Sequence, residues 1–135
     1  MNILFLLTPK INTNYLLSSY TIRQTAEKFF IHNYTALPVI DDEGKYIRTV
    51  SEGDIFRYQM QKIKKSINEF NKINILELDE ERVIKSVRND ATMDELYDLI
   101  IQQNFIPVVD DRGVYIGIIT RKRVIEYLKK NIKND

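Results

Sequence analysis

The chain of 135 residues has no cysteine, only one histidine and only four glycines. The absence of cysteine excludes a disulfide framework, a thiolate nucleophile and cysteine-based zinc sites. The lone histidine, His32, has no second histidine or cysteine near it in the sequence, so we expect no metal centre. A glycine-rich phosphate loop and a Ser–His–Asp motif are also missing. We therefore expect a protein that is not an enzyme.

A large excess of charge of either sign is missing as well, because 20 basic and 19 acidic residues give a formal net charge of +1. Without a global positive field, nucleic acid is not an expected partner. Residues 1–7 are apolar, but they are too few to span a membrane and lack the basic stretch of a secretion signal. This segment is expected to pack on the core or on a second subunit. We expect a cytoplasmic protein with no membrane association.

The sequence does contain an internal duplication at a constant offset of 69. Residues 38–58 read PVIDDEGKYIRTVSEGDIFRY, and residues 107–127 read PVVDDRGVYIGIITRKRVIEY. In each copy a short β-branched run and an Asp–Asp–x–Gly turn precede a second apolar run, which predicts a β-hairpin. The turn explains the paired aspartates of each copy better than acid–base chemistry does.

Each hairpin is followed by a hydroxyl residue, Ser51 or Thr120, and then by a helical pattern. Serine and threonine favour the N-cap position because their oxygens accept hydrogen bonds from free backbone N–H groups. Ahead of each hairpin we expect a short strand, at residues 15–17 and 83–87, and then another helix.

These earlier helices begin with capping-box spacing, Thr21 with Gln24 and Thr92 with Glu95. Apolar residues recur on one face of each helix, which predicts the side that is buried. The two expected faces are Ile22, Ala26, Phe29 and Phe30 in the first copy, and Met93, Leu96, Tyr97 and Ile100 in the second.

Between the copies, residues 52–71 are expected to form one long helix. Its apolar residues follow a heptad spacing, which predicts packing within the protein or across a dimer. This seam comprises Phe56, Met60, Ile63, Ile67 and Phe70. The acidic residues 77–81 are expected to be a solvated linker.

Each half thus reads strand, helix, strand, strand, helix, which predicts an α+β fold of two repeats related by a pseudo-twofold axis. Each half is too small to bury its own core, so we expect residues 1–135 to form a single module. Its first repeat covers about residues 8–60, a connecting helix and linker about 61–81, and the second repeat about 82–130.

The residues that carry a family resemblance lie in both copies. They are Tyr34-Thr-Ala-Leu-Pro-Val-Ile40 with Tyr46-Ile-Arg-Thr-Val-Ser-Glu-Gly-Asp54, and Asn104-Phe-Ile-Pro-Val-Val109 with Tyr115-Ile-Gly-Ile-Ile-Thr-Arg-Lys-Arg123. This pattern resembles the cystathionine β-synthase-type (CBS) domain, and the pair resembles a Bateman module of the stand-alone bacterial kind. The resemblance implies a regulatory protein that binds AMP, ADP, ATP, S-adenosylmethionine, NAD or cyclic di-AMP in clefts between the repeats. It also implies a homodimer and a regulated protein of unknown identity.

The resemblance further implies two ligand sites, which we name site A and site B. Site A combines Lys10, Thr35, Ala36, Leu37, Ile119, Thr120, Arg121 and Arg123. Site B combines Ser51 and Asp54 with Phe105, Ile106 and Val87. The family contacts ribose through an aspartate, which site B keeps as Asp54 and site A replaces with Arg123. Site B departs from the family by Arg48, which stands in place of a glycine, and by a loop two residues shorter.

These changes alter what each site can bind. A carboxylate accepts hydrogen bonds from both ribose hydroxyls, whereas arginine accepts none. Arg121, Lys122 and Arg123 lie instead at an expected helix start, where anions are favoured, so site A suits phosphates better than a bare nucleoside. Cyclic di-AMP fits this profile, although we rank it below a simple adenine nucleotide.

Two other functions stay open. Ser51 and Thr120 could be helix caps and nothing more, in which case the fold serves as a ligand-free dimerisation or interaction module. A DNA-binding role rests only on short Lys/Arg clusters, which are common and unspecific.

Overall fold

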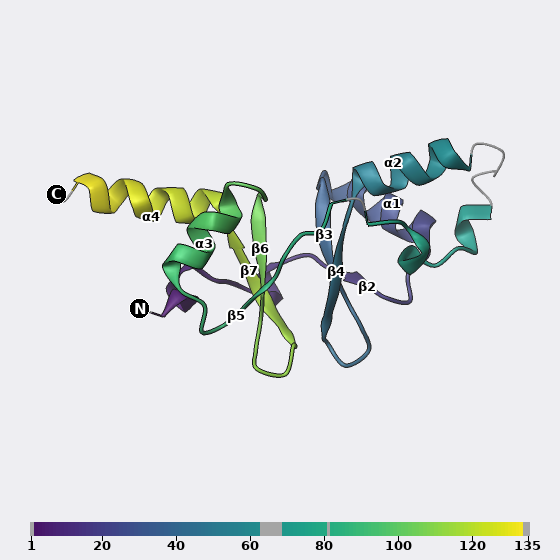
Figure 1. Ribbon diagram of the computed structural model, residues 1–135. Helices are drawn as coiled ribbons and strands as arrows, with labels where there is room; N and C mark the ends of the chain where they lie inside the picture. The colour runs from purple at the N-terminus through teal and green to yellow at the C-terminus, as the bar shows by residue number, and fades with distance from the viewer. Residues whose placement is uncertain (1, 63–68, 81, 134–135) are drawn as a thin grey trace. The chain divides into compact units, whose positions relative to one another are not determined.

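The computed structural model describes residues 2–62, 69–80 and 82–133. The chain forms two compact units: unit 1 is Met1–Asn14 with Ile84–Asp135, and unit 2 is Tyr15–Val83. Each unit contains one copy of the duplicated hairpin, labelled β3 and β4 or β6 and β7 in Figure 1, and each is described by itself.

Unit 2 is built on a three-stranded sheet in the order β2–β3–β4. Strand β2 runs parallel to β3, and β3 pairs antiparallel with β4 as the predicted hairpin. Two α-helices and two short 3-10 turns complete the described part of this unit. The elements are β2 (Leu16–Leu17), α1 (Ile22–His32), β3 (Ala36–Ile40), β4 (Tyr46–Ser51), α2 (Glu52–Gln61), η3 (Glu69–Asn71) and η4 (Ile75–Glu77).

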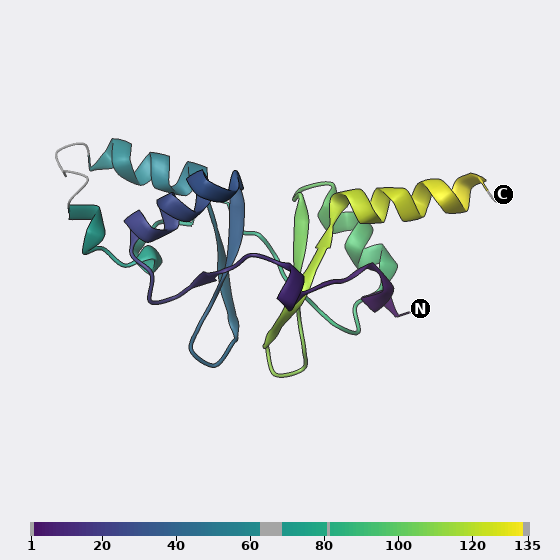
Figure 2. The same cartoon turned by 180° about the vertical axis from the view of Figure 1, so that it is seen from behind.

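Unit 1 repeats this plan and adds one strand, giving a four-stranded sheet in the order β1–β7–β6–β5. Strand β5 is parallel to β6, and β6 and β7 form the second hairpin. The extra strand β1 lies antiparallel to β7, and Figure 2 shows this N-terminal segment in purple. The elements are η1 (Ile3–Leu6), β1 (Thr8–Pro9), η2 (Lys10–Asn12), β5 (Val87–Arg88), α3 (Met93–Ile100), β6 (Phe105–Val109), β7 (Tyr115–Thr120) and α4 (Arg121–Lys133).

The predicted α+β fold and its repeated order are confirmed, since β2-α1-β3-β4-α2 is followed by β5-α3-β6-β7-α4. Each unit has its own apolar core. The fully buried residues include Leu16, Ile22, Val39, Val50 and Ile75 in unit 2, and Ile3, Leu96, Ile106, Val108, Ile119 and Val124 in unit 1. Burial of such side chains stabilises a fold by about 1.5–3 kcal/mol each.

A second repeated pattern, Asn-Ile-Leu-x-Leu, occurs at residues 2–6 and 74–78. In both copies the asparagine side chain accepts a 2.8 Å hydrogen bond from the N–H two residues later and caps a 3-10 turn. The isoleucine and the last leucine of each copy are buried. The segment before the first repeat therefore packs in the core of the unit that holds the second repeat, and residues 74–78 pack in the other unit.

The two hairpin turns confirm the prediction that each Asp–Asp–x–Gly segment forms a turn. Asp110 Oδ1 accepts hydrogen bonds from the N–H groups of Arg112 and Val114, and Asp41 Oδ1 accepts the equivalent pair. The bond from Val114 is the main cause that holds the pKa of Asp110 below its usual value. Gly44 and Gly113 adopt positive φ angles of 82° and 83° in these turns, a region that glycine enters without strain.

The helix starts agree with prediction except in one detail. Thr21 and Gln24 form both bonds of a capping box, and α1 ends at Asn33 in the left-handed conformation. Thr92 accepts the N–H of Glu95 at 3.2 Å. Within the described residues the second bond of a capping box, from the Thr92 N–H to the Glu95 carboxylate, is not formed, so Thr92 is a simple cap.

Three expectations need correction. The long helix predicted over residues 52–71 ends at Gln61, and Phe70 lies in a 3-10 turn with its ring packed on Tyr58. Ile63 and Ile67 of the predicted seam lie outside the described residues. Phe30, predicted to be buried, is 88% exposed because α1 buries the face of Ile22, Thr25 and Phe29 instead. The strand expected over 83–87 begins only at Val87.

None of the helices within the described ranges is long and apolar enough to cross a membrane.

A substitution at Gly117 in β7 tests the close packing of β1 against β7. Its φ is +150°, and a Cβ at this position would lie 2.2 Å from the carbonyl oxygen of Thr8. We expect Gly117→Ala to destabilise the protein by roughly 2–4 kcal/mol, because the strand pair must separate or strain. Thermal denaturation measures the loss. The matched control is Gly53→Ala in α2, whose three nearest atoms all belong to the Arg57 side chain, at 3.3 Å or more, and not to backbone. A Gly117→Ala protein as stable as wild type would contradict this packing.

Candidate functional site

In both units the helix after the hairpin begins at a hydroxyl residue whose side chain caps it, as predicted. In unit 2 Ser51 Oγ accepts a hydrogen bond from the N–H of Asp54 at 3.1 Å. In unit 1 Thr120 Oγ1 accepts one from the N–H of Arg123 at 3.2 Å. The two helix starts are built alike and differ in the charges around them.

Each helix start is tied by its backbone to the loop before the hairpin of its own unit. The N–H of Glu52 donates to the carbonyl of Thr35 at 2.9 Å, and the N–H of Arg121 donates to the carbonyl of Asn104 at 2.8 Å. The four residues correspond through the offset of 69. The loop and the helix start of one unit therefore form a single local structure.

The structure places the members of each predicted site in both units. Site A has Thr35, Ala36 and Leu37 in unit 2, and Lys10, Ile119, Thr120, Arg121 and Arg123 in unit 1. Site B has Ser51 and Asp54 in unit 2, and Phe105, Ile106 and Val87 in unit 1. Within each unit these residues are neighbours: Ala36 pairs with Ser51, and Phe105 pairs with Thr120. That the two parts of a site serve one ligand stays a prediction.

Burial limits what some of these residues can offer. The side chains of Leu37, Ile106 and Ile119 are buried in the apolar cores, so only their backbone groups can meet a ligand. Thr35 is exposed, and Thr120 is partly exposed. Backbone amides and carbonyls beside small side chains suit recognition of the edge of a purine.

The first turn of α4 carries three cations, Arg121, Lys122 and Arg123, and no acidic residue. Arg121 Nε donates to the carbonyl of Ile100 at 2.7 Å, and Arg123 Nη2 donates to the carbonyl of Phe5 at 3.1 Å. Each guanidinium has five N–H donors, so further donors remain for a ligand. Cations are disfavoured at a helix N-terminus, where the helix dipole is positive. The arrangement therefore favours an anion.

The first turn of α2 has the opposite charge. It contains Glu52 and Asp54, and Asp54 is 6% exposed. Asp54 Oδ2 accepts the N–H of Ser51 at 2.9 Å, and Oδ1 accepts Arg57 Nη2 at 3.2 Å. Arg48 Nη2 lies 4.0 Å from Oδ2. Sequence reasoning had noted Arg48 as a departure from the family but gave no sign that it contacts Asp54.

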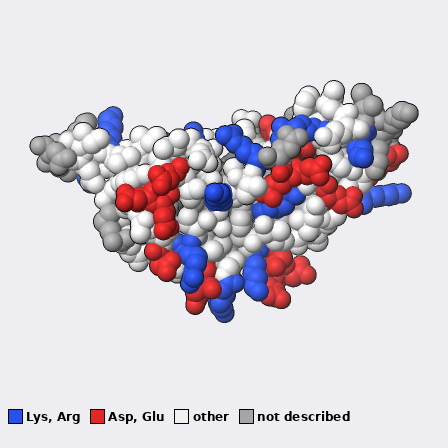
Figure 3. Space-filling model, viewed as in Figure 1, with Lys and Arg blue, Asp and Glu red and all other residues white. Residues whose placement is uncertain are grey.

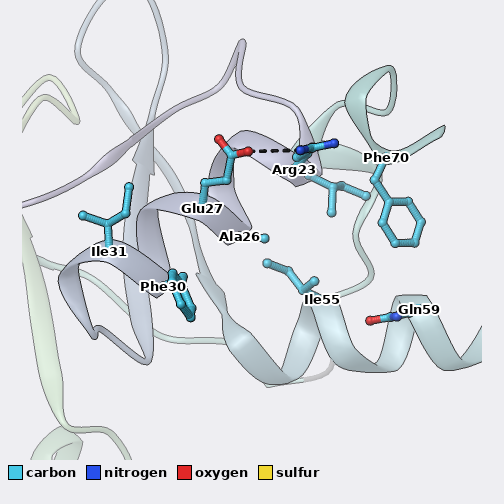
Figure 4. A pocket seen from close by; sticks show the side chains of 9 residues that line it. Arg23, Ala26, Glu27, Phe30, Ile31, Ile55, Gln59 and Phe70 are labelled. Atoms are coloured by element: carbon cyan, nitrogen blue, oxygen red, sulfur yellow. Dashed lines mark hydrogen bonds and ion pairs between the residues drawn. The ribbon is translucent and has the colours of Figure 1, made fainter. Parts of the chain in front are cut away.

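A groove between α1 and α2 in unit 2 encloses about 490 Å³. Figure 4 shows Phe30 of α1 on the side of the groove toward Ile55 of α2, with Gln59 further along α2. The nine lining residues are Ile22, Arg23, Ala26, Glu27, Phe30, Ile31, Ile55, Gln59 and Phe70. None of them belongs to site A or site B. Sequence reasoning missed the groove because the 3.6-residue period placed Phe30 in the core.

Two further observations bear on the chemistry available. Within the ranges that the structure describes, no three His, Cys, Asp or Glu side chains gather to hold a metal ion. On the face drawn in Figure 3, basic and acidic side chains are interspersed. The described residues of each unit on that face form no continuous positive surface of the kind that binds nucleic acid.

Comparison with known proteins gives the family. The family model of the CBS domain matches residues 13–61 and 80–130 of this chain. Among curated proteins, the L-aspartate semialdehyde sulfurtransferase of Methanocaldococcus jannaschii is 28% identical over 107 residues, which is 79% of this chain. The chain spans only 19% of the length of that relative.

Two solved structures show the same fold. The crystal structure of CbpB in complex with c-di-AMP has a TM-score of 0.87 at 24% identity, over 99% of this chain and 88% of that one. The crystal structure of CBSX2 in complex with AMP has a TM-score of 0.75 at 24% identity, over 96% of both chains.

Proposed function

Because the chain belongs to the CBS domain family and carries two of its repeats, we propose that it is a non-catalytic regulatory module that binds an adenine nucleotide. Two structural neighbours were solved with such ligands, c-di-AMP in one and AMP in the other.

The observation that carries the proposal is the charge at the start of α4. Its first turn has three basic residues and no acid, whereas the matching turn of α2 supplies its own acids. Basic residues at a helix start repel one another and the helix dipole unless an anion lies among them. A nucleotide phosphate supplies that anion.

In the predicted site A, each part of the nucleotide would have a partner. Arg121 and Arg123 would bind the phosphate, since guanidinium groups match phosphate oxygens. The hydroxyl of Thr120 and the side chain of Lys10 would add polar contacts near it. The loop residues Thr35 and Ala36 of the other repeat would take the adenine through backbone groups. This assignment follows the family resemblance residue by residue.

Cyclic di-AMP is the second candidate ligand. It carries two phosphates, and the cluster of three cations at one helix start favours a ligand with more than one negative charge. In either case a ligand that prefers one arrangement of the chain would shift its population and so alter a regulated protein. If no nucleotide binds, the ligand-free interaction module is the remaining reading.

A ligand panel tests the proposal. We expect AMP, ATP, S-adenosylmethionine, NAD or cyclic di-AMP to raise the melting temperature, by an amount that corresponds to about 2.7 kcal/mol at a hundredfold excess over Kd. Arg123→Glu should abolish the shift because it places a carboxylate where the phosphate binds. Isothermal titration then gives the affinity.

The matched control is Lys129→Glu, which makes the same change in charge on an exposed residue further along α4. It should bind nucleotide within about twofold of wild type, since charges far apart on the surface are screened. No binding of any of the five compounds at millimolar concentration would reject the proposed function.

We also propose that the module forms a homodimer through its helices. Large apolar side chains are exposed on α1 and α2: Phe30 at 88%, Ile31 at 72%, Phe56 at 62% and Met60 at 55%. Unit 1 exposes Ile101 and Ile125 at the corresponding places, offset by 71 from Phe30 and by 69 from Phe56. Exposed apolar surface of this kind, beside a groove of the same character, is typical of a protein interface. A second copy of the chain exposes the same apolar residues, so two copies can bury them against each other.

Analytical ultracentrifugation tests the dimer. We expect a dimer at micromolar concentration, and a monomer for Phe30→Asp or Phe56→Asp because a buried, unpaired carboxylate is costly. The control Val83→Asp adds the same charge at an exposed apolar residue outside the helices and should leave the dimer intact. A monomeric wild-type protein at high concentration would contradict the proposal.

A further inference from the structure

We infer that Arg48 and Arg57 hold Asp54 as an internal counterion, which closes site B and leaves one nucleotide per chain. This inference deepens the proposed function and rests on it for the ligand. It concerns unit 2 alone, where the three side chains and their surroundings are described.

The oxygens of Asp54 are already engaged inside the unit. Oδ2 accepts the backbone N–H of Ser51 and lies 4.0 Å from Arg48 Nη2, while Oδ1 accepts Arg57 Nη2 at 3.2 Å. The carboxylate is 6% exposed. A ligand hydroxyl would find little exposed surface on this carboxylate and would compete with Arg57, whose charge-assisted bond is roughly twice as strong as a neutral one.

Arg48 is the more buried of the two arginines beside Asp54. It leaves strand β4, is 10% exposed, and donates from Nη1 to the carbonyl of Leu78 at 2.5 Å. Leu78 is itself buried, at the end of the Asn-Ile-Leu-x-Leu segment. Arg48 therefore joins β4, the first turn of α2 and residues 74–78. The guanidinium is buried, and moving it aside would break its hydrogen bond to Leu78 and its 4.0 Å contact with Asp54.

The second repeat has a different residue at each position that matches Arg48, Asp54 and Arg57. The position of Arg48 is Gly117, and backbone of β1 lies where a side chain would be. The positions of Asp54 and Arg57 are Arg123 and Glu126, so the order of charge along the helix is reversed. In unit 1 the helix start thus keeps a cation that is exposed, and in unit 2 it keeps an anion that is buried and paired. Only the first of these can meet a nucleotide phosphate.

Counting bound nucleotides tests the inference. Isothermal titration of the full chain with AMP and, separately, with cyclic di-AMP is expected to give one binding event per chain. Arg48→Gly, which installs the glycine of the second repeat, should add a second event. Arg48→Gly/Asp54→Asn should lose that second event, because the amide presents only one acceptor oxygen and no charge. Two events in wild type, or none gained by a folded Arg48→Gly protein, would overturn the inference.

A double-mutant cycle tests the pairing without any ligand. Arg48→Met and Asp54→Asn are each expected to lower the melting temperature by roughly 5–15 °C, because each leaves a buried charge without its partner. The double variant should lose clearly less than the sum, since it removes both charges. Arg23→Met, which breaks the exposed pair with Glu27, is the control and should change the melting temperature little. Additive losses in the cycle would overturn the inference.

The two tests separate the possible failures. If wild type binds neither nucleotide, the proposed function fails, and the cycle alone then decides whether Asp54 is an internal counterion. If wild type binds two nucleotides, the proposed function stands and the closed site is wrong.

Discussion

The first backbone N–H groups of a helix need acceptors, and this requirement governs the two helix starts that follow the hairpins. Ser51 and Thr120 each satisfy one N–H group by the same side-chain bond. The remaining positive potential at the N-terminus of each helix is balanced differently in α2 and in α4. In α2 the buried Asp54 balances it from within the chain, and in α4 three basic residues leave it open to an anion from outside. The division of labour that we propose between the repeats follows from this difference.

The duplication explains why such divergence is possible. Each unit closes its own apolar core with a hairpin, two helices and an Asn-Ile-Leu-x-Leu turn, so the core can form with charges of either sign at the helix start. Position 117 must be glycine because the backbone of β1 lies where a side chain at this position would be. The matching position 48 in the other repeat has room for an arginine. One repeat can therefore keep an exposed cluster of cations while the other uses the same positions to fasten its own segments together.

Local patterns in the sequence predicted much of this fold. The caps at Thr21, Ser51 and Thr120 each involve two residues three positions apart, and each hairpin turn involves five consecutive residues. Both features could therefore be predicted from the local sequence. The end of α2 could not, because apolar spacing continues beyond Gln61 and nothing in a heptad marks where a helix stops. Phe30 was placed in the core for a related reason: the period gives an apolar face but not which part of it another element covers. The contact of Arg48 with Asp54 and Leu78 joins residues up to 30 apart and needed the structure.

The central claim is that the start of α4 meets the nucleotide and the start of α2 does not. A two-dimensional amide spectrum of the protein, recorded as AMP or cyclic di-AMP is added, tests it most directly. The account predicts that the amide signals of residues 120–123 shift on binding and that those of residues 51–54 stay in place. Shifts at 51–54 with none at 120–123 would contradict it.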